Sequence, residues 1–506
     1  MRASQRVSFI VPLEPRTTKR RWVMAAILLV TFLTAIEGTV LNTALPVIVG
    51  ELGGWDSMSW VVSIYLLTTA IVTPISGNLA DRFGRKPVLL IGIGLFLFGT
   101  LLCGFADSMG QLIFFRALQG LGSGFIVPIT FTIVADIYPF ELRARAQGWI
   151  STVWGASAVI SPFTGGLIVD YVSWRWIFFA GIPIGLLAIV LMWRFFFESE
   201  RKQQHSISIP SIVLFVMAIA CFMYGLNGAG TDVDTASWTS IPRSIYLSAA
   251  FICFLLFLRI DNRSQSPLIP LRFMRNPAIL VPNTADFLLN GILVAINFYI
   301  PLWVQGIHGI GAVGSGLILL AMSVAWPISA GASGMLIKRF GMRTVSLLGH
   351  IMIAIASFGL IFQDLRMSLG ILVGLLTIMG FGFGVTFTVH IVSVQSSVQW
   401  QERGRAIASN NLMRQMGQAI GISTLGVMLS SKVAVLLGQR TESEAVGLSM
   451  DDLFHSAALS ELSDSSIHLL RQVLAMGMQP IFLVLIVLAV LSLLSSLRLP
   501  RAITEQ

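Results

Sequence analysis

The chain has 506 residues, of which 55% are hydrophobic and 11% charged, and its formal net charge is +9. An average soluble domain carries roughly 25% charged residues, so this composition indicates an integral membrane protein with little soluble mass. The positive residues lie in short links between apolar runs, where they signal topology and contact lipid head groups, so nucleic acid is not an expected partner. The three cysteines and six histidines are scattered, which argues against disulfides and a metal site.

Fourteen apolar runs are long enough to cross a bilayer as helices, and the seventh and eighth are the weakest of them. They are approximately 22–45, 58–79, 87–106, 110–134, 146–169, 174–197, 208–229, 243–260, 280–305, 313–337, 343–362, 368–393, 405–431 and 475–498. The first run is too long for the apolar core of a signal peptide, so we expect a retained helix. Lys and Arg concentrate in alternate links, which predicts an even number of spans and two cytoplasmic termini.

The link after the second span is short and strongly charged, and reads Gly77-Asn78-Leu79-Ala80-Asp81-Arg82-Phe83-Gly84-Arg85-Lys86. Gly77 and Gly84 favour close helix packing and a sharp turn. The charged residues could latch the cytoplasmic face during a conformational change. The alternative is a loop that merely anchors two helix ends.

The chain contains a weaker copy of this link, from Gly334 to Arg343, and a second repeated stretch, Arg143–Ala146 and Arg403–Ala406. Both repeated stretches are separated from their first copies by nearly the same number of residues, which predicts two similar halves. The expected organisation is a basic arm at 1–21, a six-helix bundle at 22–200, inserted helices at 201–262, a second six-helix bundle at 263–498 with an outer loop at 432–474, and a tail at 499–506. The outer loop is expected to form short amphipathic helices or to be disordered.

Glu37 lies in the first span, in Ala35-Ile36-Glu37-Gly38-Thr39-Val40-Leu41-Asn42-Thr43-Ala44-Leu45-Pro46. It is roughly 22 Å along the helix from Trp22, beyond the bilayer middle, at about 1.5 Å per residue. A charge near the midplane costs on the order of 3 kcal/mol, so this carboxyl is expected to be paired or protonated. Glu37 is therefore a candidate proton carrier. The alternative is a structural acid that is hydrogen-bonded to a neighbouring helix.

Arg116 lies in the fourth span and is followed by Gln119, Gly120, Gly122 and Gly124. A guanidinium stays protonated, so it needs a partner or water. Glycines on the following turns imply tight packing, which makes snorkelling to the membrane surface a poor explanation. Arg116 is a candidate to assist proton transfer, with a purely structural role as the alternative.

The fifth span contains Trp154-Gly155-Ala156-Ser157-Ala158-Val159-Ile160-Ser161-Pro162-Phe163-Thr164-Gly165-Gly166. Pro162 is expected to kink the helix, and Gly165 and Gly166 permit the close approach of another helix.

Asp286 and Asn290 lie one turn apart on one face of the ninth span. Asp286 either binds substrate or a second proton, or reaches water from near the cytoplasmic end. Arg414 and Gln418 share a face of the thirteenth span and could pair with Asp286. His390, near the end of the twelfth span, is expected to be a packed or interfacial histidine rather than a titrating one.

Several of these stretches resemble a known family. Residues 77–86 are similar to the cytoplasmic signature of the major facilitator superfamily of transporters, and residues 35–46 resemble the first helix of its fourteen-helix drug/proton antiporters. That helix commonly carries Asp where this chain has Glu37. The stretch from Arg116 matches the family's Arg-x-x-Gln-Gly-x-Gly pattern. The stretch 161–166 is similar to the antiporter motif Gly-Pro-x-x-Gly-Gly, with Ser161 at the first glycine, which weakens the inference of antiport.

The resemblance implies an all-helical membrane fold with two six-helix bundles and two inserted helices. It implies proton-coupled export of amphipathic or cationic drugs across the cell membrane by alternating access. Proton coupling would fall to Glu37, Arg116 and Asp286. The substrate cavity would include Asn42, Gln119, Trp154, Asn290, Phe298 and Arg414. The conformational gate would comprise Gly77, Asp81, Arg82, Gly84, Arg85 and Lys86, and the antiporter motif Gly155, Ser161, Pro162, Gly165 and Gly166.

The expected partners are a small amphipathic or cationic molecule and membrane lipid, the expected state is a monomer, and no cofactor is expected besides the coupling proton. One alternative is export of an endogenous lipid, sugar or peptide-like compound. Another is a non-transporting receptor on a transporter scaffold, although such a receptor need not keep costly charges within its spans. The sequence has no Gly-x-x-x-x-Gly-Lys-Ser/Thr loop and no Ser-His-Asp set, so neither an ATP-driven pump nor an enzyme is expected.

Overall fold

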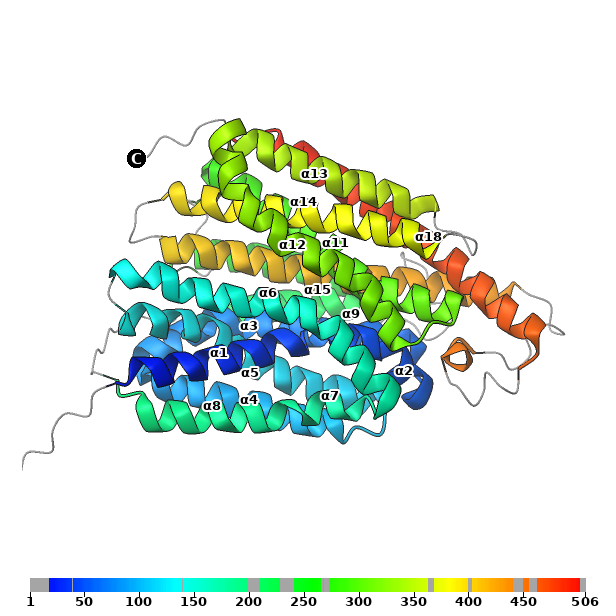
Figure 1. Ribbon diagram of the computed structural model, residues 1–506, viewed down its shortest axis with the longest axis horizontal. Coiled ribbons are helices and arrows are strands. Elements are labelled where there is room, and N and C mark those ends of the chain that lie inside the picture. Colours follow the sequence, from blue (N-terminus) through cyan, green and yellow to red (C-terminus); the bar gives the residue numbers. More distant parts are fainter. Residues whose placement is uncertain are drawn as a thin grey trace, which may run out of the picture.

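The protein is described by a computed structural model in which long helices run side by side in two groups (Figure 1). The structure describes residues 18–38, 40–138, 140–198, 209–227, 241–264, 267, 273–362, 368–398, 403–439, 449–454 and 462–500. Most of the basic arm, much of the outer loop and most of the tail lie outside these residues, as do the side chains of Asp81 and Pro162.

The first bundle contains two spans that bend. Its helices are α1 (Arg20–Glu37), α2 (Leu41–Leu52), α3 (Met58–Phe83), α4 (Arg85–Gly104), α5 (Met109–Ile137), α6 (Phe140–Tyr171), α7 (Arg175–Phe179) and α8 (Gly181–Phe195). α1 and α2 meet at 48°, directly after Glu37. The two parts of α6, Gly148–Ser161 and Phe163–Tyr171, meet at 41°. Pro162 lies between them and cannot donate the backbone hydrogen bond of a straight helix.

The second bundle repeats features of the first. Its helices are α11 (Pro277–His308), α12 (Ala312–Phe340), α13 (Met342–Gly359), α14 (Leu369–Ser396), α15 (Arg403–Gly438) and α18 (Asp464–Ser496). The turn between α3 and α4 passes through Gly84 at φ +96°, and that between α12 and α13 passes through Gly341 at φ +78°. Glycine adopts positive φ with little strain, so both copies of the link retain the residue that the turn requires.

The inserted helices α9 (Ile209–Asn227) and α10 (Ile241–Asp261) pack against each other and across the seam between the two bundles. The rings of Phe215 and Phe257 are 5.0 Å apart. These two helices share an apolar cluster with Leu67 of α3 and Leu412 of α15. The pair therefore contacts one helix from each half of the chain.

Within the described residues, eleven helices are long and apolar enough to cross a membrane, or up to thirteen if each bent pair is one span. The expected seventh span appears as a shorter apolar helix, Pro210–Phe222, within α9. The total of fourteen spans stays a prediction. Large apolar side chains are exposed on the outward face of α8, among them Leu186, Val190 and Trp193, as expected of a surface that meets lipid.

α1 begins and α18 ends at the same end of the molecule, on the left in Figure 1. This end carries the charged links after α3 and α12, and we call it the inner end because its lysines and arginines predict that it faces the cytoplasm. The opposite end is called the outer end. Which side each end faces stays a prediction.

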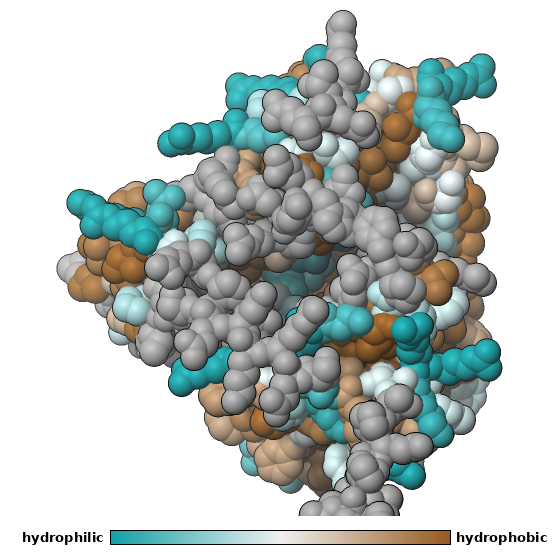
Figure 2. Space-filling view, turned by 90° about the vertical axis from the view of Figure 1, so that its left-hand side faces the viewer, coloured by the Kyte–Doolittle hydropathy of each residue, from teal (hydrophilic) through white to brown (hydrophobic). Residues whose placement is uncertain are grey.

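The two bundles are joined near the outer end. Asp170, at the end of α6, accepts hydrogen bonds from the backbone N–H groups of Ala312 (3.1 Å) and Val313 (2.9 Å), at the start of α12. The side-chain amide of Gln305 on α11 donates to the carbonyl of Thr43 on α2 at 3.0 Å. Viewed from the inner end, the molecule is hollowed near its centre, with hydrophilic residues inside the hollow (Figure 2). The bundles are therefore hydrogen-bonded to each other near the outer end, and the face at the inner end is hollowed.

Close helix packing also leads to a stability prediction in the first bundle. A Cβ atom added to Gly99 on α4 would lie 2.5 Å from the backbone N and 2.7 Å from the Cα of Gln119 on α5, whereas Gly94 on the same helix has open space around it. Gly99→Ala should destabilise the protein by about 1–3 kcal/mol, because two backbones must separate. Gly94→Ala is the matched control. Thermal unfolding in detergent should show a lower midpoint for Gly99→Ala only, and equal midpoints would contradict the close approach.

Candidate functional site

A buried acid and a buried arginine face each other inside the first bundle. Glu37 ends α1 and is fully buried, and Arg116 of α5 is 1% exposed. The Nη1 atom of Arg116 lies 3.7 Å from Oε2 of Glu37. The two sequence-predicted proton-coupling residues of this bundle are thus neighbours, although they lie on different helices.

Arg116 is fixed by neighbours other than Glu37. Its Nη1 donates to Oε1 of Gln119 at 2.5 Å, and its Nε donates to the carbonyl of Val61 on α3 at 3.3 Å. The guanidinium also lies over the ring of Tyr65, 4.2 Å from the centroid. Gln119 in turn donates to Thr100 Oγ1 of α4 at 2.7 Å. The guanidinium is therefore held by contacts that do not involve Glu37.

Glu37 is held far less firmly than Arg116. Neither of its carboxyl oxygens makes a hydrogen bond to the part of the chain that the structure describes. A buried carboxylate without donors is costly, and a proton removes that charge. At 3.7 Å the arginine favours the ionised form, so two opposing effects act on one group. This balance suits a carboxyl that binds and releases a proton.

A second buried polar cluster lies in the second bundle, around Asp286 of α11. Asp286 is 1% exposed, so the alternative in which it reaches water is not observed. Its Oδ1 lies 2.6 Å from Nδ1 of His390 on α14, and its Oδ2 accepts a hydrogen bond from the amide of Asn410 on α15 at 2.9 Å. Asn410 also donates to Asn283 Oδ1 at 3.0 Å.

His390, expected to be a packed or interfacial histidine, is fully buried and contacts Asp286. Its Nε2 lies 3.3 Å from Ser346 Oγ on α13, and the same hydroxyl lies 3.4 Å from Nδ1 of His350. Both imidazoles are fully buried. Two histidines in apolar helices, together with one acid on another span, were the available signal, but no sequence motif joins them.

The predicted polar residues of the ninth and thirteenth spans do come together. Gln418 donates to Asn290 Oδ1 at 2.9 Å, and Asn290 donates to the backbone carbonyl of Asp286 at 2.8 Å. Arg414 makes no direct ion pair with Asp286 in the described structure, but it is near enough to interact electrostatically. Its guanidinium lies over the ring of Phe387, 4.4 Å from the centroid.

The other predicted cavity residues lie in different surroundings. Trp154 on α6 is 40% exposed. Asn42 on α2 is buried, and its Oδ1 makes no hydrogen bond to the described residues. Phe298 is 2% exposed and packs in the core against Tyr299, with ring centroids 4.8 Å apart. The substrate-cavity assignment of these three residues remains a prediction.

The charged link at the inner end is bound to its own bundle. Arg85 forms an ion pair with Asp136 of α5, and its backbone N–H donates to the Glu198 carboxylate at 2.8 Å. Lys86 Nζ donates to the carbonyls of Trp193 at 2.8 Å and Phe196 at 2.5 Å. Glu198, just beyond α8, was not singled out by the sequence. Arg82 and Gly77 are exposed.

Two glycines of the antiporter motif, Gly165 and Gly166, lie where helices meet. A Cβ atom on Gly165 would lie 2.5 Å from Val40 Cγ2, just before α2, and one on Gly166 would lie 2.5 Å from Val313 Cα of α12. α6 therefore touches both its own bundle and the other one through consecutive glycines. Ser161 donates to the carbonyl of Ser157 within α6 at 2.6 Å. Gly155 has open space around it.

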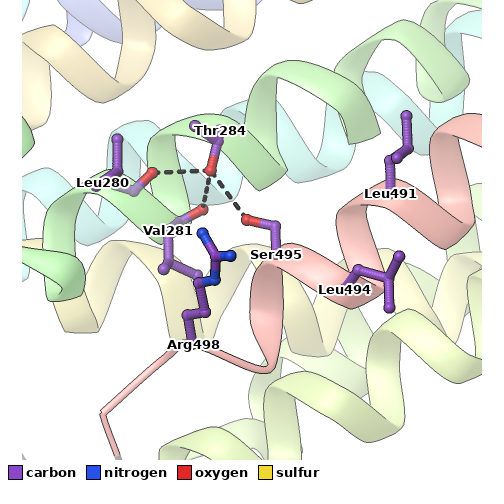
Figure 3. Close-up of a pocket in the computed structure, with 7 residues that line it drawn as sticks. All are labelled: Leu280, Val281, Thr284, Leu491, Leu494, Ser495 and Arg498. Carbon is purple, nitrogen blue, oxygen red and sulfur yellow. Dashed lines mark hydrogen bonds between the residues drawn. The ribbon is translucent and has the colours of Figure 1, made fainter.

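A groove of about 340 Å³ lies between α11 and α18 (Figure 3). It is lined by Leu280, Val281, Thr284, Leu491, Leu494, Ser495 and Arg498. The Thr284 and Ser495 hydroxyls are 3.0 Å apart. Leu280, Leu491 and Leu494 are exposed, so the groove opens on the outward face of the bundle and is separate from the buried clusters.

The chain is similar in sequence to bacterial multidrug transporters. The chain is 29% identical over 425 residues to the multidrug transporter protein MdtP of Bacillus subtilis (strain 168), which covers 84% of this chain and 78% of that protein. It is 28% identical over 491 residues to multidrug resistance protein 3 of the same organism, over 95% of each.

Solved structures share the fold. A bacterial homologue of the human lysosomal transporter Spinster, in an inward-facing and unoccupied conformation, matches with a TM-score of 0.67 at 17% identity, over 95% of this chain and 97% of that one. A D-xylose–proton symporter matches with a TM-score of 0.57 at 14% identity, over 81% and 90%. The family model described as Major Facilitator Superfamily matches residues 27–422, most of the chain. The chain therefore belongs to the Major Facilitator Superfamily of multi-pass membrane transporters.

Proposed function

We propose that the protein is a proton-coupled antiporter that exports amphipathic or cationic compounds across the cell membrane. The observation that carries the proposal is the fully buried carboxyl of Glu37, which makes no hydrogen bond to the described residues and lies 3.7 Å from Arg116. The relatives named as multidrug proteins support the substrate class.

The charges explain how a proton and a cation can exclude each other. When Glu37 is ionised, it offsets the positive charge of Arg116, so a cation that binds between the bundles would meet little repulsion. When Glu37 is protonated, Arg116 is uncompensated in a medium of low dielectric, where charges interact strongly. A cationic substrate then loses affinity and leaves. Protonation from outside and deprotonation to the inside would drive export as the bundles rock.

The same machinery could export an endogenous lipid, sugar or peptide-like compound. A neutral compound would not be repelled by Arg116, so its release would have to be coupled to protonation through a change in the shape of the binding site. A receptor without transport is disfavoured by the buried charges in both bundles, which a receptor would keep at a cost in stability. We further propose that the protein acts as a monomer and uses no cofactor besides protons.

Glu37→Gln should abolish export driven by an imposed pH gradient, because glutamine cannot cycle a proton. Substrate should still bind and move down its own gradient. Glu37→Asp should keep part of the activity, since the charge remains and only its reach is shortened. The measurement is dye or tetraphenylphosphonium export from proteoliposomes with and without a pH gradient. Full gradient-driven export by Glu37→Gln would show that coupling resides elsewhere.

We also propose that the charged link 77–86 stabilises the inner end when the cavity opens outward. Arg85 and Lys86 already brace the turn through Asp136, Glu198 and the carbonyls at the end of α8. Arg85→Gln should lower the transport rate several-fold, while substrate binding to purified protein stays near wild type. Arg259→Gln, an exposed arginine at the end of α10, is the control. A wild-type rate for Arg85→Gln would contradict this role.

Membrane lipid is the second partner that we propose, and the groove between α11 and α18 is suited to it. Its exposed leucines can cover an acyl chain, and Arg498 with the two hydroxyls can hold a phosphate at the inner surface. Arg498→Gln should reduce the amount of anionic phospholipid that co-purifies in mild detergent, measured by mass spectrometry. Arg339→Gln, exposed at the end of α12, should not. Equal lipid content in both variants would exclude this groove as a head-group site.

A further inference from the structure

Coupling at Glu37 does not use the hydrogen-bonded cluster around Asp286, a residue that the family resemblance also associates with proton coupling. We propose that Asp286 and His390 form a second proton-binding site, which holds one proton between them and releases it when a cationic substrate occupies the cavity. The proposal rests on the proposed antiport and adds a second coupled proton to it. Asp286 lies on the first helix of its bundle, α11, as Glu37 lies on α1.

The geometry provides a place for the proton. His390 Nδ1 and Asp286 Oδ1 are 2.6 Å apart, and both side chains are at most 1% exposed. With one added proton the carboxylate and imidazole together carry no net charge. Without it the pair carries one negative charge. An isolated charge is costly in an apolar interior, so the pair retains the proton unless another positive charge compensates for its loss.

Ser346 allows His390 to exist in both protonation states. The His350 Nδ1 atom lies 2.8 Å from the Ser346 carbonyl, so in neutral His350 this nitrogen carries the proton. The Ser346 hydroxyl is then free to donate to His390 Nε2, while His390 Nδ1–H donates to Asp286. When a proton adds to His390 Nε2, the same hydroxyl turns and accepts it. A hydroxyl can act in either direction, so the added proton finds a partner without any helix moving.

Two of the neighbouring helices bring a charged or titratable group near this pair. Arg414 approaches from α15, and His350 approaches from α13 behind Ser346. Asn410 and Asn283 contribute only neutral amides. Arg414 is partly exposed and lies over the Phe387 ring. With the pair protonated, Arg414 is uncompensated and repels a cation. With the pair deprotonated, Asp286 offsets Arg414, and a cation can bind.

The test is the number of protons exchanged per exported tetraphenylphosphonium ion in proteoliposomes. It is obtained from the pH gradient at which net flux reverses. His390→Gln should lower this number by one proton relative to wild type, and Asp286→Asn should do the same. His468→Gln, at an exposed position early in α18, should match wild type. An unchanged ratio in His390→Gln overturns the proposal.

A second measurement covers the case in which a variant cannot transport. Purified protein in weak buffer should release protons when tetraphenylphosphonium is added, and His390→Gln should release fewer per bound cation. Release equal to wild type overturns the second site. If wild type instead fails to couple export to a pH gradient, yet its proton release depends on His390, the antiport proposal fails and the site stands.

Discussion

A charge placed inside a membrane-spanning bundle has to be compensated, and this constraint shapes the interior of both halves of the molecule. In the first bundle, Arg116 is held by a glutamine, a carbonyl and a tyrosine ring, while the carboxyl opposite has no hydrogen bond in the described structure. In the second, Asp286 is surrounded by an imidazole and an amide. One acid is thus left poorly satisfied, and the other is well satisfied.

This difference separates two ways of placing a titratable group in a low-dielectric interior. A carboxyl that lacks donors depends on a single cation for its ionised form, so its charge follows small changes in the distance to that cation. A carboxyl within a hydrogen-bonded cluster keeps its surroundings and shifts its proton among neighbours instead. In the first site, close packing of α4 and α5 at Gly99 holds Gln119, which is a partner of Arg116.

Much of the architecture follows from local patterns in the sequence. Apolar runs and charged links indicated the spans. Gly84 and Gly341 marked the repeated turn, because a turn with positive φ favours glycine at that position in the sequence. The family pattern assigned Glu37 and Arg116 to proton coupling, but their contact was not predicted. The contact between Asp286 and His390 was not predicted. The two residues are 104 positions apart, and no short sequence pattern indicates which helices pack together.

Glu198 illustrates the same limit at the surface. A single glutamate after a span looks like any solvated charge, yet it accepts hydrogen bonds from two backbone N–H groups at the start of α4. The orphan N–H groups at a helix start always need partners, but the sequence does not say which distant side chain supplies them. The bend of α6 at Pro162, in contrast, could be predicted because the missing N–H belongs to the helix itself.

The inserted helices contact α3 and α15 through side chains such as Leu67, Phe215, Phe257 and Leu412, which carry no polar atoms. Apolar attraction of this kind has no preferred direction, so these contacts do not depend on one fixed orientation of the helices. In the rocking motion that we propose for transport, α9 and α10 would have to move along at least one of the two bundles. Such an apolar contact would keep the seam between α3 and α15 covered during that motion.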